Sequence, residues 1–394
     1  MRNNNGLRHI HIVEKEACCG CTACYAVCPK KAISMCQDEE GFQYPVVDQG
    51  KCVNCGLCIK KCPLIRENAA KDTECFYAVI NNQENVRAAS SSGGAFSALA
   101  QHVVGCNGVV YGAAYDAEFA VRHIRTDADT WERLRTSKYV QSDMGDIFLQ
   151  VKADLQQGRM VLFTGTPCQI DGLKNSLSDI NTANLITCDL ICHGVPSPRI
   201  WREYLTQLKK ETKKEIAKIN FRNKSEHGWH NSTLRIESVD GAVLADEQQS
   251  QGFFFRLFFS HLILRPSCNS CHYANLKRVG DITIGDYWGV EKHYSQLDDN
   301  KGISLVMVNT AKGLETMEEI KKNCTVIPVA KEECMQPNLE APAKVYGGHD
   351  LFWRTYQRYG LKFAGKRMGY IPKSFLDKAL VFAVRVIEKI FVNK

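Results

Sequence analysis

The sequence predicts a small α+β module at the amino terminus, followed by a larger α/β domain. Three observations predict this organisation. Two cysteine runs of identical spacing lie within residues 18–63, and short apolar segments alternate with helical patterns from residue 75 onward. The chain of 394 residues is long enough for two or three domains, and its composition, 44% hydrophobic and 24% charged, is that of a globular protein.

The 19 cysteines raise the question of whether they form disulfides or bind metal. Disulfide-rich domains are usually small and secreted, whereas this chain is long and its first residues lack the apolar core of a secretory signal. No run of about 18 apolar residues predicts a transmembrane helix. The sequence therefore favours metal ligation in a cytoplasmic protein. The net charge of +7 is modest, and the absence of a long Lys/Arg run argues against a nucleic-acid partner.

The amino-terminal module contains the two cysteine runs. Each has the spacing C-x2-C-x2-C-x3-C-P, which is typical of bacterial ferredoxins with two [4Fe–4S] clusters. In such proteins the fourth cysteine of each run binds the other cluster. One cluster is therefore assigned to Cys18, Cys21, Cys24 and Cys62. The other is assigned to Cys52, Cys55, Cys58 and Cys28.

Zinc is the alternative metal, because CxxC pairs also form tetrahedral zinc sites. Two complete runs of the ferredoxin type argue against zinc. Cys19 and Cys36 fall outside the pattern, and the segment from Gly41 to Asp48 is expected to form a strand and a turn. Residues 8–68 are thus predicted to be a ferredoxin-like α+β module with two clusters.

A polar linker is expected over residues 65–74, and the α/β pattern begins after it. Strands are expected at 75–80, 108–115, 160–165 and 185–190, with helices at 95–104 and 170–177 and a further helix that ends at Asp154. This alternation predicts an α/β core with some parallel sheet.

Two further elements are expected downstream. A hairpin is predicted over 232–248, with its turn at Asp240 and Gly241. Residues 303–310 and 325–330 are expected to form a terminal strand pair that flanks a helix from Lys312 to Lys322.

A second group of cysteines lies in the body of the chain. Cys168 and Cys192 each follow a predicted strand, and Cys268 and Cys271 form a CxxC pair in a loop. Loops at the carboxyl ends of parallel strands converge in space, so these four thiols can meet and bind a third [4Fe–4S] cluster. A redox pair with two buried thiols is the alternative.

A run of serine and glycine from Ser90 to Gly94 precedes one of the predicted helices. Backbone N–H groups at such a position suit an anion such as a pyrophosphate, although an ordinary helix cap is the alternative.

Six segments of the body together resemble the beta subunit of coenzyme F-420 hydrogenases and dehydrogenases. They are SSGGAFSAL, TSKYVQS, GTPCQIDGLK, DLICHGVPSP, CNSCHYAN and DITIGDYWG, and the resemblance spans roughly residues 75–340. It implies an α/β flavin- and cluster-binding domain, with an FAD-binding region at 75–175 and a third-cluster region at 176–345. By motif, the third cluster falls on Cys168, Cys192, Cys268 and Cys271. The FAD contacts fall on Ser92, Gly93, Gly94, Lys138, Tyr139, Thr166 and Asp286.

The function expected from these features is an iron–sulfur flavoprotein oxidoreductase. It would move electrons between ferredoxin or a partner subunit and an organic two-electron acceptor such as coenzyme F-420, with FAD converting single electrons into pairs. The alternatives are a non-catalytic electron-relay subunit of a larger redox complex and a reductase in a biosynthetic pathway, for example of a polysaccharide. His227 and His230, beside Trp229, are candidate proton donors to the acceptor, and a surface loop is the other interpretation.

Residues 346–394 are expected to form a basic, amphipathic helical tail. Its apolar face comprises Leu376, Leu380, Ala383, Ile387 and Phe391. A peripheral contact with a membrane surface or a partner is one interpretation, and packing on its own domain is the other.

Overall fold

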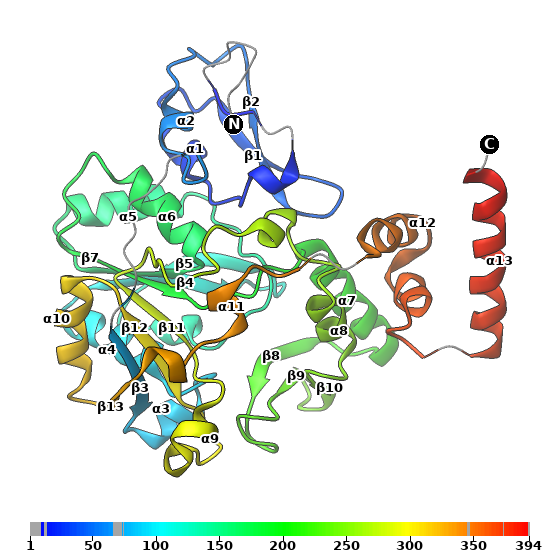
Figure 1. Ribbon diagram of the computed structural model, residues 1–394. Helices are drawn as coiled ribbons and strands as arrows, with labels where there is room; N and C mark the ends of the chain where they lie inside the picture. Colours follow the sequence, from blue (N-terminus) through cyan, green and yellow to red (C-terminus); the bar gives the residue numbers. More distant parts are fainter. Residues whose placement is uncertain are drawn as a thin grey trace.

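The computed structural model describes residues 9–11, 14–65, 73, 75–344, 347–372 and 374–392. Most of the segment expected to be a linker, 65–74, lies outside this part of the chain. In Figure 1 the amino-terminal module lies at one end of a layered body, and the carboxyl-terminal helices lie at its side.

The amino-terminal module is built from short elements. They are β1 (Ile33–Gln37) and β2 (Gln43–Val47), which pair antiparallel, and the single-turn helices α1 (Ala23–Ala26) and α2 (Leu57–Lys60). Asp38 closes the turn between the strands by accepting backbone N–H bonds from Glu40 and Phe42. The expected strand and turn within 41–48 are therefore confirmed.

The body contains an eight-stranded mixed sheet in the order β13-β3-β12-β11-β7-β6-β4-β5. Its strands are β3 (Cys75–Asn81), β4 (Val109–Tyr115), β5 (Val121–Thr126), β6 (Val161–Gly165), β7 (Leu185–Leu190), β11 (Ile282–Asp286), β12 (Ser304–Val308) and β13 (Cys324–Val329). The neighbours β11, β7, β6 and β4 run parallel to one another, which confirms the expected α/β core with some parallel sheet. Strands from both ranges, 75–175 and 176–345, belong to this one sheet.

The expected terminal strand pair is wrong. β12 and β13 do not pair with each other, because β3 lies between them and pairs antiparallel with both. The apolar pattern of each strand marks it as buried, but it carries no information about which strand becomes its neighbour.

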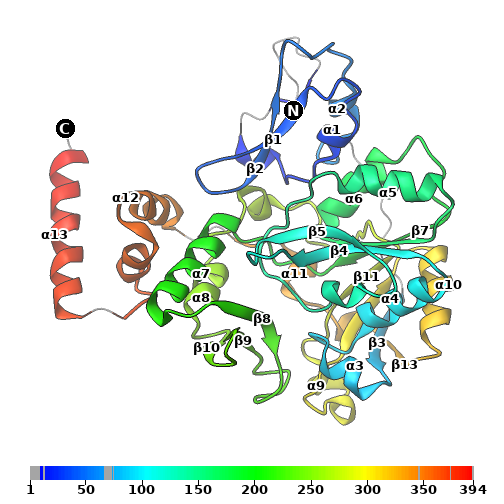
Figure 2. The ribbon, with the colours of Figure 1, turned by 180° about the vertical axis from the view of Figure 1, so that it is seen from behind.

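Helices cover both faces of the sheet, as Figures 1 and 2 show. On one face, α4 (Ala95–Gly105) and α10 (Ala311–Ile320) bury Leu99, Val103 and Met317 against strand residues such as Leu162 and Val306. The other face carries α5 (Ile147–Gln156) and α6 (Pro167–Ser176). Side chains from α5 and α6 pack there with Tyr111 and Phe163, and Cys19, Cys21 and Ala23 of the module join the same cluster.

A second lobe packs beside the sheet. It contains α7 (Pro198–Thr212), α8 (Phe253–Phe259), α12 (His349–Met368) and a three-stranded sheet of β8 (Ile216–Asn223), β9 (Thr233–Ser238) and β10 (Val243–Gln248). β9 and β10 form the expected hairpin around Asp240 and Gly241. The smaller helices are α3 (Glu84–Ala88), α9 (Val290–His293) and α11 (Pro337–Glu340).

The last helix, α13 (Phe375–Val392), lies at the edge of the molecule beyond α12 (Figure 1). Leu376 and Leu380 on this helix are 78% and 54% exposed. The side chains of Ile387 and Phe391, which the sequence assigns to the same apolar face, are outside the described part. No helix within the described ranges is both long and apolar enough to cross a membrane.

Candidate iron–sulfur sites

The carboxyl edge of the parallel strands gathers most of the expected site residues. Thr166 and Cys168 follow β6, Cys192 follows β7, and Asp286 ends β11. Because these three strands run parallel side by side, their ends meet at one edge. Gly93 reaches the same edge, since its carbonyl accepts a hydrogen bond from Asn81 at the end of β3.

The four body cysteines lie together at this edge. Cys192 faces Cys168, Cys268 and Cys271, and Cys268 also faces Cys168 and Cys271. Burial raises the pKa of Cys192 well above its ordinary value, and the neighbouring thiols add to this shift. Burial also raises the pKa of Cys268 to about 12. Four crowded thiols cannot all ionise unless a cation compensates them, and iron coordinated by the sulfurs would supply that compensation.

Three local features hold these cysteines in place. Thr166 and Gln169 form a capping box at the start of α6, which places Cys168 in the first turn beside the Thr166 hydroxyl, with Oγ1 and Sγ 3.2 Å apart. The N–H of Cys268 donates to the carbonyl of Arg265. Gly194 has a φ of +134°, and a Cβ there would lie 2.9 Å from Leu264 and 3.3 Å from the Cβ of Cys268, so only glycine fits.

A single metal ion and a four-iron cluster make different demands on four cysteines. Within the ranges that the structure describes, no three His, Cys, Asp or Glu side chains converge closely enough to hold one metal ion. A tetrahedral zinc site would need such convergence, whereas a cubane spreads its four thiolates over four iron corners.

The module brings its two predicted cysteine sets together in the same way. Cys28, Cys52, Cys55 and Cys58 line one small pocket, which also includes His9. Backbone N–H groups already point at two of these sulfurs, from Ile10 to Cys58 at 3.2 Å and from Ala32 to Cys28 at 3.3 Å. Such N–H···S bonds stabilise a charged thiolate.

The other set gathers beside it. Cys24 faces Cys18 and Cys62, and Cys21 faces Cys24 and Cys62. Cys24 also faces Cys58, so the two sets adjoin.

Cys19 is a residue that the spacing pattern did not single out. It is buried, and its side chain interacts with both Cys21 and Cys168. Cys19 therefore lies where the module meets the edge of the sheet. The only sequence signal for this position is the Cys18–Cys19 doublet.

The module is docked on α5 and α6 through α1. Tyr25 donates to Asp146 at the start of α5 at 2.6 Å, and Gly172 of α6 lies directly under Cys21. A Cβ added at Gly172 would be 2.7 Å from the sulfur of Cys21.

We expect Gly172→Ala to displace Cys21 and to weaken the first cluster of the module. The added Cβ would collide with the sulfur of Cys21, and neither this sulfur nor the backbone of α6 can move freely in the packed interior. Iron analysis of the anaerobic protein is expected to show less iron per chain. Gly105→Ala is the matched control, because a Cβ at this helical glycine meets nothing within 4 Å. An alanine at 172 with full iron content would contradict the expectation.

The residues expected to contact FAD are largely engaged within the chain. Ser92 donates to the carbonyl of Ile303, and a Cβ at Gly93 would lie 2.3 Å from the carbonyl oxygen of Val79. The ammonium of Lys138 donates to the carbonyls of Leu134, Arg135 and Thr136, while burial lowers the pKa of Lys138 to about 7. Tyr139 packs among three aromatic rings, those of Phe221, Phe255 and Phe258.

Asp286 belongs to a cluster that the sequence did not indicate as a whole. It accepts a hydrogen bond from the indole of Trp229 at 2.8 Å and pairs with Arg222 at 3.3 Å. Trp288 stacks on Trp229 with ring centroids 4.8 Å apart, and the Arg222 guanidinium lies 5.0 Å from the Trp288 ring. The Nε group of Arg222 is buried without a hydrogen-bond partner, whereas Nη2 is the nitrogen that pairs with Asp286. Buried unpaired donors of this kind point to a bound ligand or water.

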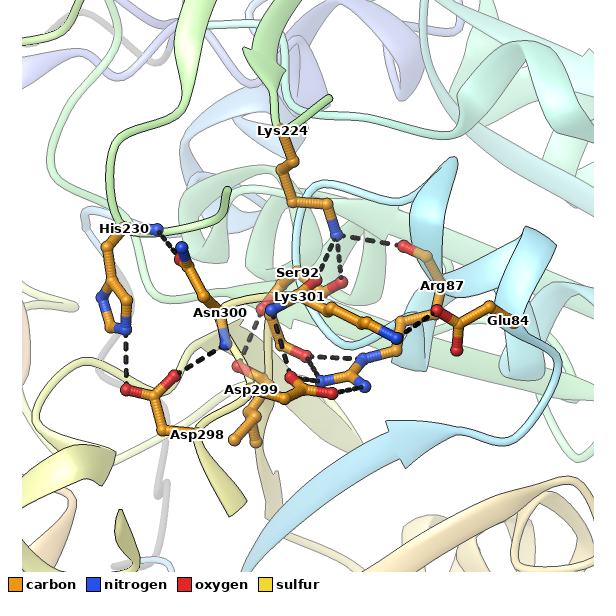
Figure 3. A network of polar contacts seen from close by, with 11 residues as sticks. Glu84, Arg87, Ser92, Lys224, His230, Asp298, Asp299, Asn300 and Lys301 are labelled. Atoms are coloured by element: carbon orange, nitrogen blue, oxygen red, sulfur yellow. Dashed lines mark hydrogen bonds and ion pairs between the residues drawn. The ribbon is translucent and has the colours of Figure 1, made fainter. Parts of the chain in front are cut away.

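One of the two candidate histidines, His230, belongs to a polar network, as Figure 3 shows. His227 and His230 are both exposed, and His230 contacts Asp298 through Nε2 at 2.7 Å while its N–H donates to Asn300. Next to them, Lys224 donates to the carbonyls of Arg87, Ser92 and Lys301. The network therefore fixes the loop before β12 against the Ser92 loop.

A cavity of about 390 Å³ opens between the module and α7. Gly20, Gln43, Phe119, Gln141 and Trp201 are among the residues that line it. Gly20 lies within the Cys18–Cys21 loop, so a molecule in this cavity would lie beside the first cysteine set.

Comparison with family models identifies two parts of the chain. Residues 17–64 match the model of the 4Fe–4S dicluster domain. Together with the gathered cysteines, this match defines the class: an iron–sulfur protein of the oxidoreductase type that transfers electrons. Residues 158–332 match the model of the carboxyl-terminal part of the coenzyme F420 hydrogenase/dehydrogenase beta subunit, so this part of the chain is similar to that family. The resemblance stated from the motifs is confirmed.

Among solved structures, the chain is similar to one from the F420-reducing [NiFe] hydrogenase complex of Methanosarcina barkeri, studied in a xenon derivative. The two are 16% identical with a TM-score of 0.45, and the match covers 75% of this chain and 91% of that one. No curated protein matches the chain.

Proposed function

We propose that this protein is an FAD-containing iron–sulfur oxidoreductase with three [4Fe–4S] clusters. It exchanges electrons with ferredoxin or a partner subunit and with an organic two-electron acceptor such as coenzyme F-420. In this proposal residues 8–68 hold two clusters, 75–175 contribute to the FAD site and 176–345 hold the third cluster. Residues 346–394 form a helical tail whose first helix, α12, packs in the second lobe.

The observation that carries the proposal is the continuity of the three cysteine sets. Cys24 faces Cys58 across the two sets of the module, and Cys19 interacts with Cys168 at the edge of the sheet. Electrons that enter the module would therefore pass through neighbouring cysteine sets toward the body of the protein. Cys18, Cys21, Cys24 and Cys62 would hold the first cluster, Cys28, Cys52, Cys55 and Cys58 the second, and Cys168, Cys192, Cys268 and Cys271 the third.

The flavin is proposed for the same edge, near Ser92, Gly93, Gly94, Lys138, Tyr139, Thr166 and Asp286. When bound, a flavin accepts electrons singly and delivers them in pairs. The buried Nε group of Arg222, which has no hydrogen-bond partner, supports a ligand with carbonyl or anionic oxygens at this place. Asp286 would keep Arg222 oriented, and Trp288, 39% exposed, would shield the site from water.

Cofactor analysis after anaerobic purification tests this proposal. We expect about twelve irons, a similar amount of sulfide and about one FAD per chain, because three four-iron clusters and one flavin are proposed. Colourless protein without iron would contradict the whole proposal. Full iron without flavin would contradict the FAD assignment and leave an iron–sulfur relay.

Turnover separates an enzyme from a relay. The isolated chain is supplied with reduced ferredoxin or dithionite, and reduction of coenzyme F-420 and other organic acceptors is measured. Turnover by the chain alone supports the oxidoreductase, whereas turnover that requires an added partner subunit supports the relay.

The tail is proposed to contact a partner subunit or a membrane surface. Exposed Leu376 and Leu380 on α13, together with the neighbouring basic residues, support such a contact.

A further inference from the structure

We propose that Arg265 is a positioning residue. Its hydrogen bonds hold the loop of the first cluster of the module next to the loop of the third cluster, and its positive charge raises the reduction potential of both clusters. This inference rests on the proposed function, since it requires that the cysteine sets hold clusters.

The side chain of Arg265 reaches from the body into the module. It is 1% exposed, and all three of its nitrogens donate hydrogen bonds. Nε donates to the carbonyl of Cys18 at 2.8 Å, Nη2 to the carbonyl of Gln43 at 2.9 Å, and Nη1 to Oε1 of Gln141 at 2.9 Å. Gln141 in turn donates to the carbonyl of Cys19 at 3.1 Å. The guanidinium thus holds the first cysteine loop by its backbone.

The backbone of Arg265 belongs to the other site. Its N–H donates to the carbonyl of Val195, three residues after Cys192, and its carbonyl accepts the N–H of Cys268. Arg265 therefore joins the loops that would hold the first and third clusters. Any movement of the Cys18 loop away from the body would break the side-chain bonds of Arg265.

The module is shaped to receive this side chain. Gly20 has a φ of +69°, and a Cβ there would lie 2.7 Å from Nη1, so a larger residue would collide with the guanidinium. Tyr44 and Phe42 cover the cation, at 4.3 Å and 5.5 Å from their ring centroids.

Within the described ranges, no carboxylate forms an ion pair or a hydrogen bond with the side chain of Arg265. The ionisable groups near the guanidinium include Cys18, Cys19, Cys268 and Tyr44, and its hydrogen-bond acceptors are neutral amide oxygens. A buried cation without a counter-ion is costly. Clusters held by thiolates carry negative charge, so clusters on both sides of Arg265 would supply the missing balance.

The positive charge of Arg265 would also change the reduction potentials of the first and third clusters. Reduction adds one electron to a cluster, and a nearby cation in a low-dielectric interior stabilises the reduced form more than the oxidised form. The net charge around a cluster and the hydrogen bonds near its sulfurs are known determinants of its potential. Arg265 should therefore make the first and third clusters easier to reduce.

The test compares Arg265→Gln, which removes the charge, with Arg265→Lys, which keeps the charge but loses the planar fork. Arg235→Gln is the matched control, because Arg235 bonds to Glu226, Glu237 and Asp246 in the separate three-stranded sheet. Each protein is purified anaerobically, its iron is counted, and its clusters are followed by electron paramagnetic resonance during a redox titration.

We expect Arg265→Gln to lower the equilibrium constant for reduction of two of the three clusters by about tenfold or more, which is about 59 mV for one electron. Arg265→Lys is expected to keep the potentials closer to those of the wild type but to slow transfer from the module to the third cluster. Arg235→Gln should change neither property.

Unchanged potentials in Arg265→Gln with full iron content would overturn the inference and leave the proposed function intact. If Arg265→Gln fails to fold, Arg265→Lys decides: transfer at the wild-type rate would overturn the positioning role, and slowed transfer with full iron would support it. Wild-type protein without iron would overturn the proposed function itself.

Discussion

Cys168→Ser is expected to remove about four irons per chain and the signal of one cluster, while the two clusters of the module remain. The reason is geometric. Cys168 faces Cys192, Cys268 and Cys271 at the edge of the sheet, and loss of one thiolate from a set of four leaves an iron corner without its ligand. Because Cys168 also contacts Cys19, the variant should interrupt electron flow at the junction. Iron analysis and electron paramagnetic resonance of the reduced protein measure the first effect, and reduction of an organic acceptor measures the second.

Cys188→Ser is the matched control for this experiment. Cys188 lies in β7 of the same sheet and is fully buried, but it packs in the apolar core on α4 and α10 rather than with the cysteines proposed as cluster ligands. We expect this variant to retain its iron and to lose only some stability. A Cys168→Ser protein with full iron and three cluster signals would defeat the assignment of the third cluster.

Asp189→Ala is expected to destabilise the protein by about 3–5 kcal/mol, the usual cost of leaving one partner of a buried ion pair alone. Asp189 and Arg278 are 0% and 1% exposed. Arg278 donates to Oδ1 of Asp189 at 2.8 Å, and the N–H of Gly280 donates to Oδ2 at 2.8 Å. Without the carboxylate, the guanidinium would remain buried with only uncharged oxygen acceptors. Urea unfolding of the anaerobic protein measures the change in the free energy of unfolding.

The position of this ion pair gives it a second consequence. Asp189 lies three residues before Cys192, and Arg278 also binds the carbonyls of Tyr273 and Asn275, shortly after Cys271. Asp189→Ala should therefore loosen both ends of the third cysteine set and lower its iron content.

Two further variants complete this test. The double variant Asp189→Leu with Arg278→Met removes both charges and is expected to recover much of the lost stability, because a buried ion pair contributes little compared with apolar side chains of similar volume. Glu318→Ala breaks an exposed pair with Lys321 and should cost less than about 1 kcal/mol. An Asp189→Ala protein as stable as Glu318→Ala would contradict the prediction.

Local patterns predicted the parts of the fold that depend on neighbouring residues. The strand-turn segment near Gly41, the α/β alternation after residue 75 and the hairpin at Asp240 and Gly241 are all present. The neighbour of a strand depends on residues far away in the chain, and for this reason the insertion of β3 between β12 and β13 was not foreseen.

The residues of the candidate site fall into the same two groups, those predicted from the local sequence and those whose role depends on distant contacts. Strand ends in a parallel sheet converge, so the meeting of Cys168, Cys192 and the Cys268–Cys271 loop followed from their positions after predicted strands. Arg222 and Arg265 gave no such signal. Each lies in an ordinary local sequence, and its role depends on distant contacts. Arg222 pairs with Asp286 and keeps Nε buried without a partner, and Arg265 binds the Cys18 loop.

The sequence by itself determined the kind of chemistry. In a short loop, the number of residues between two thiols and the covalent geometry of the chain set how the thiols can be placed around a metal group. The sequence therefore indicated the cysteine sets of the module without knowledge of the rest of the chain. Only the tertiary structure decided how the module meets the body. The contact of Cys19 with Cys168 and the reach of Arg265 to Cys18 join segments distant in sequence, and such contacts depend on the packing of whole helices and sheets.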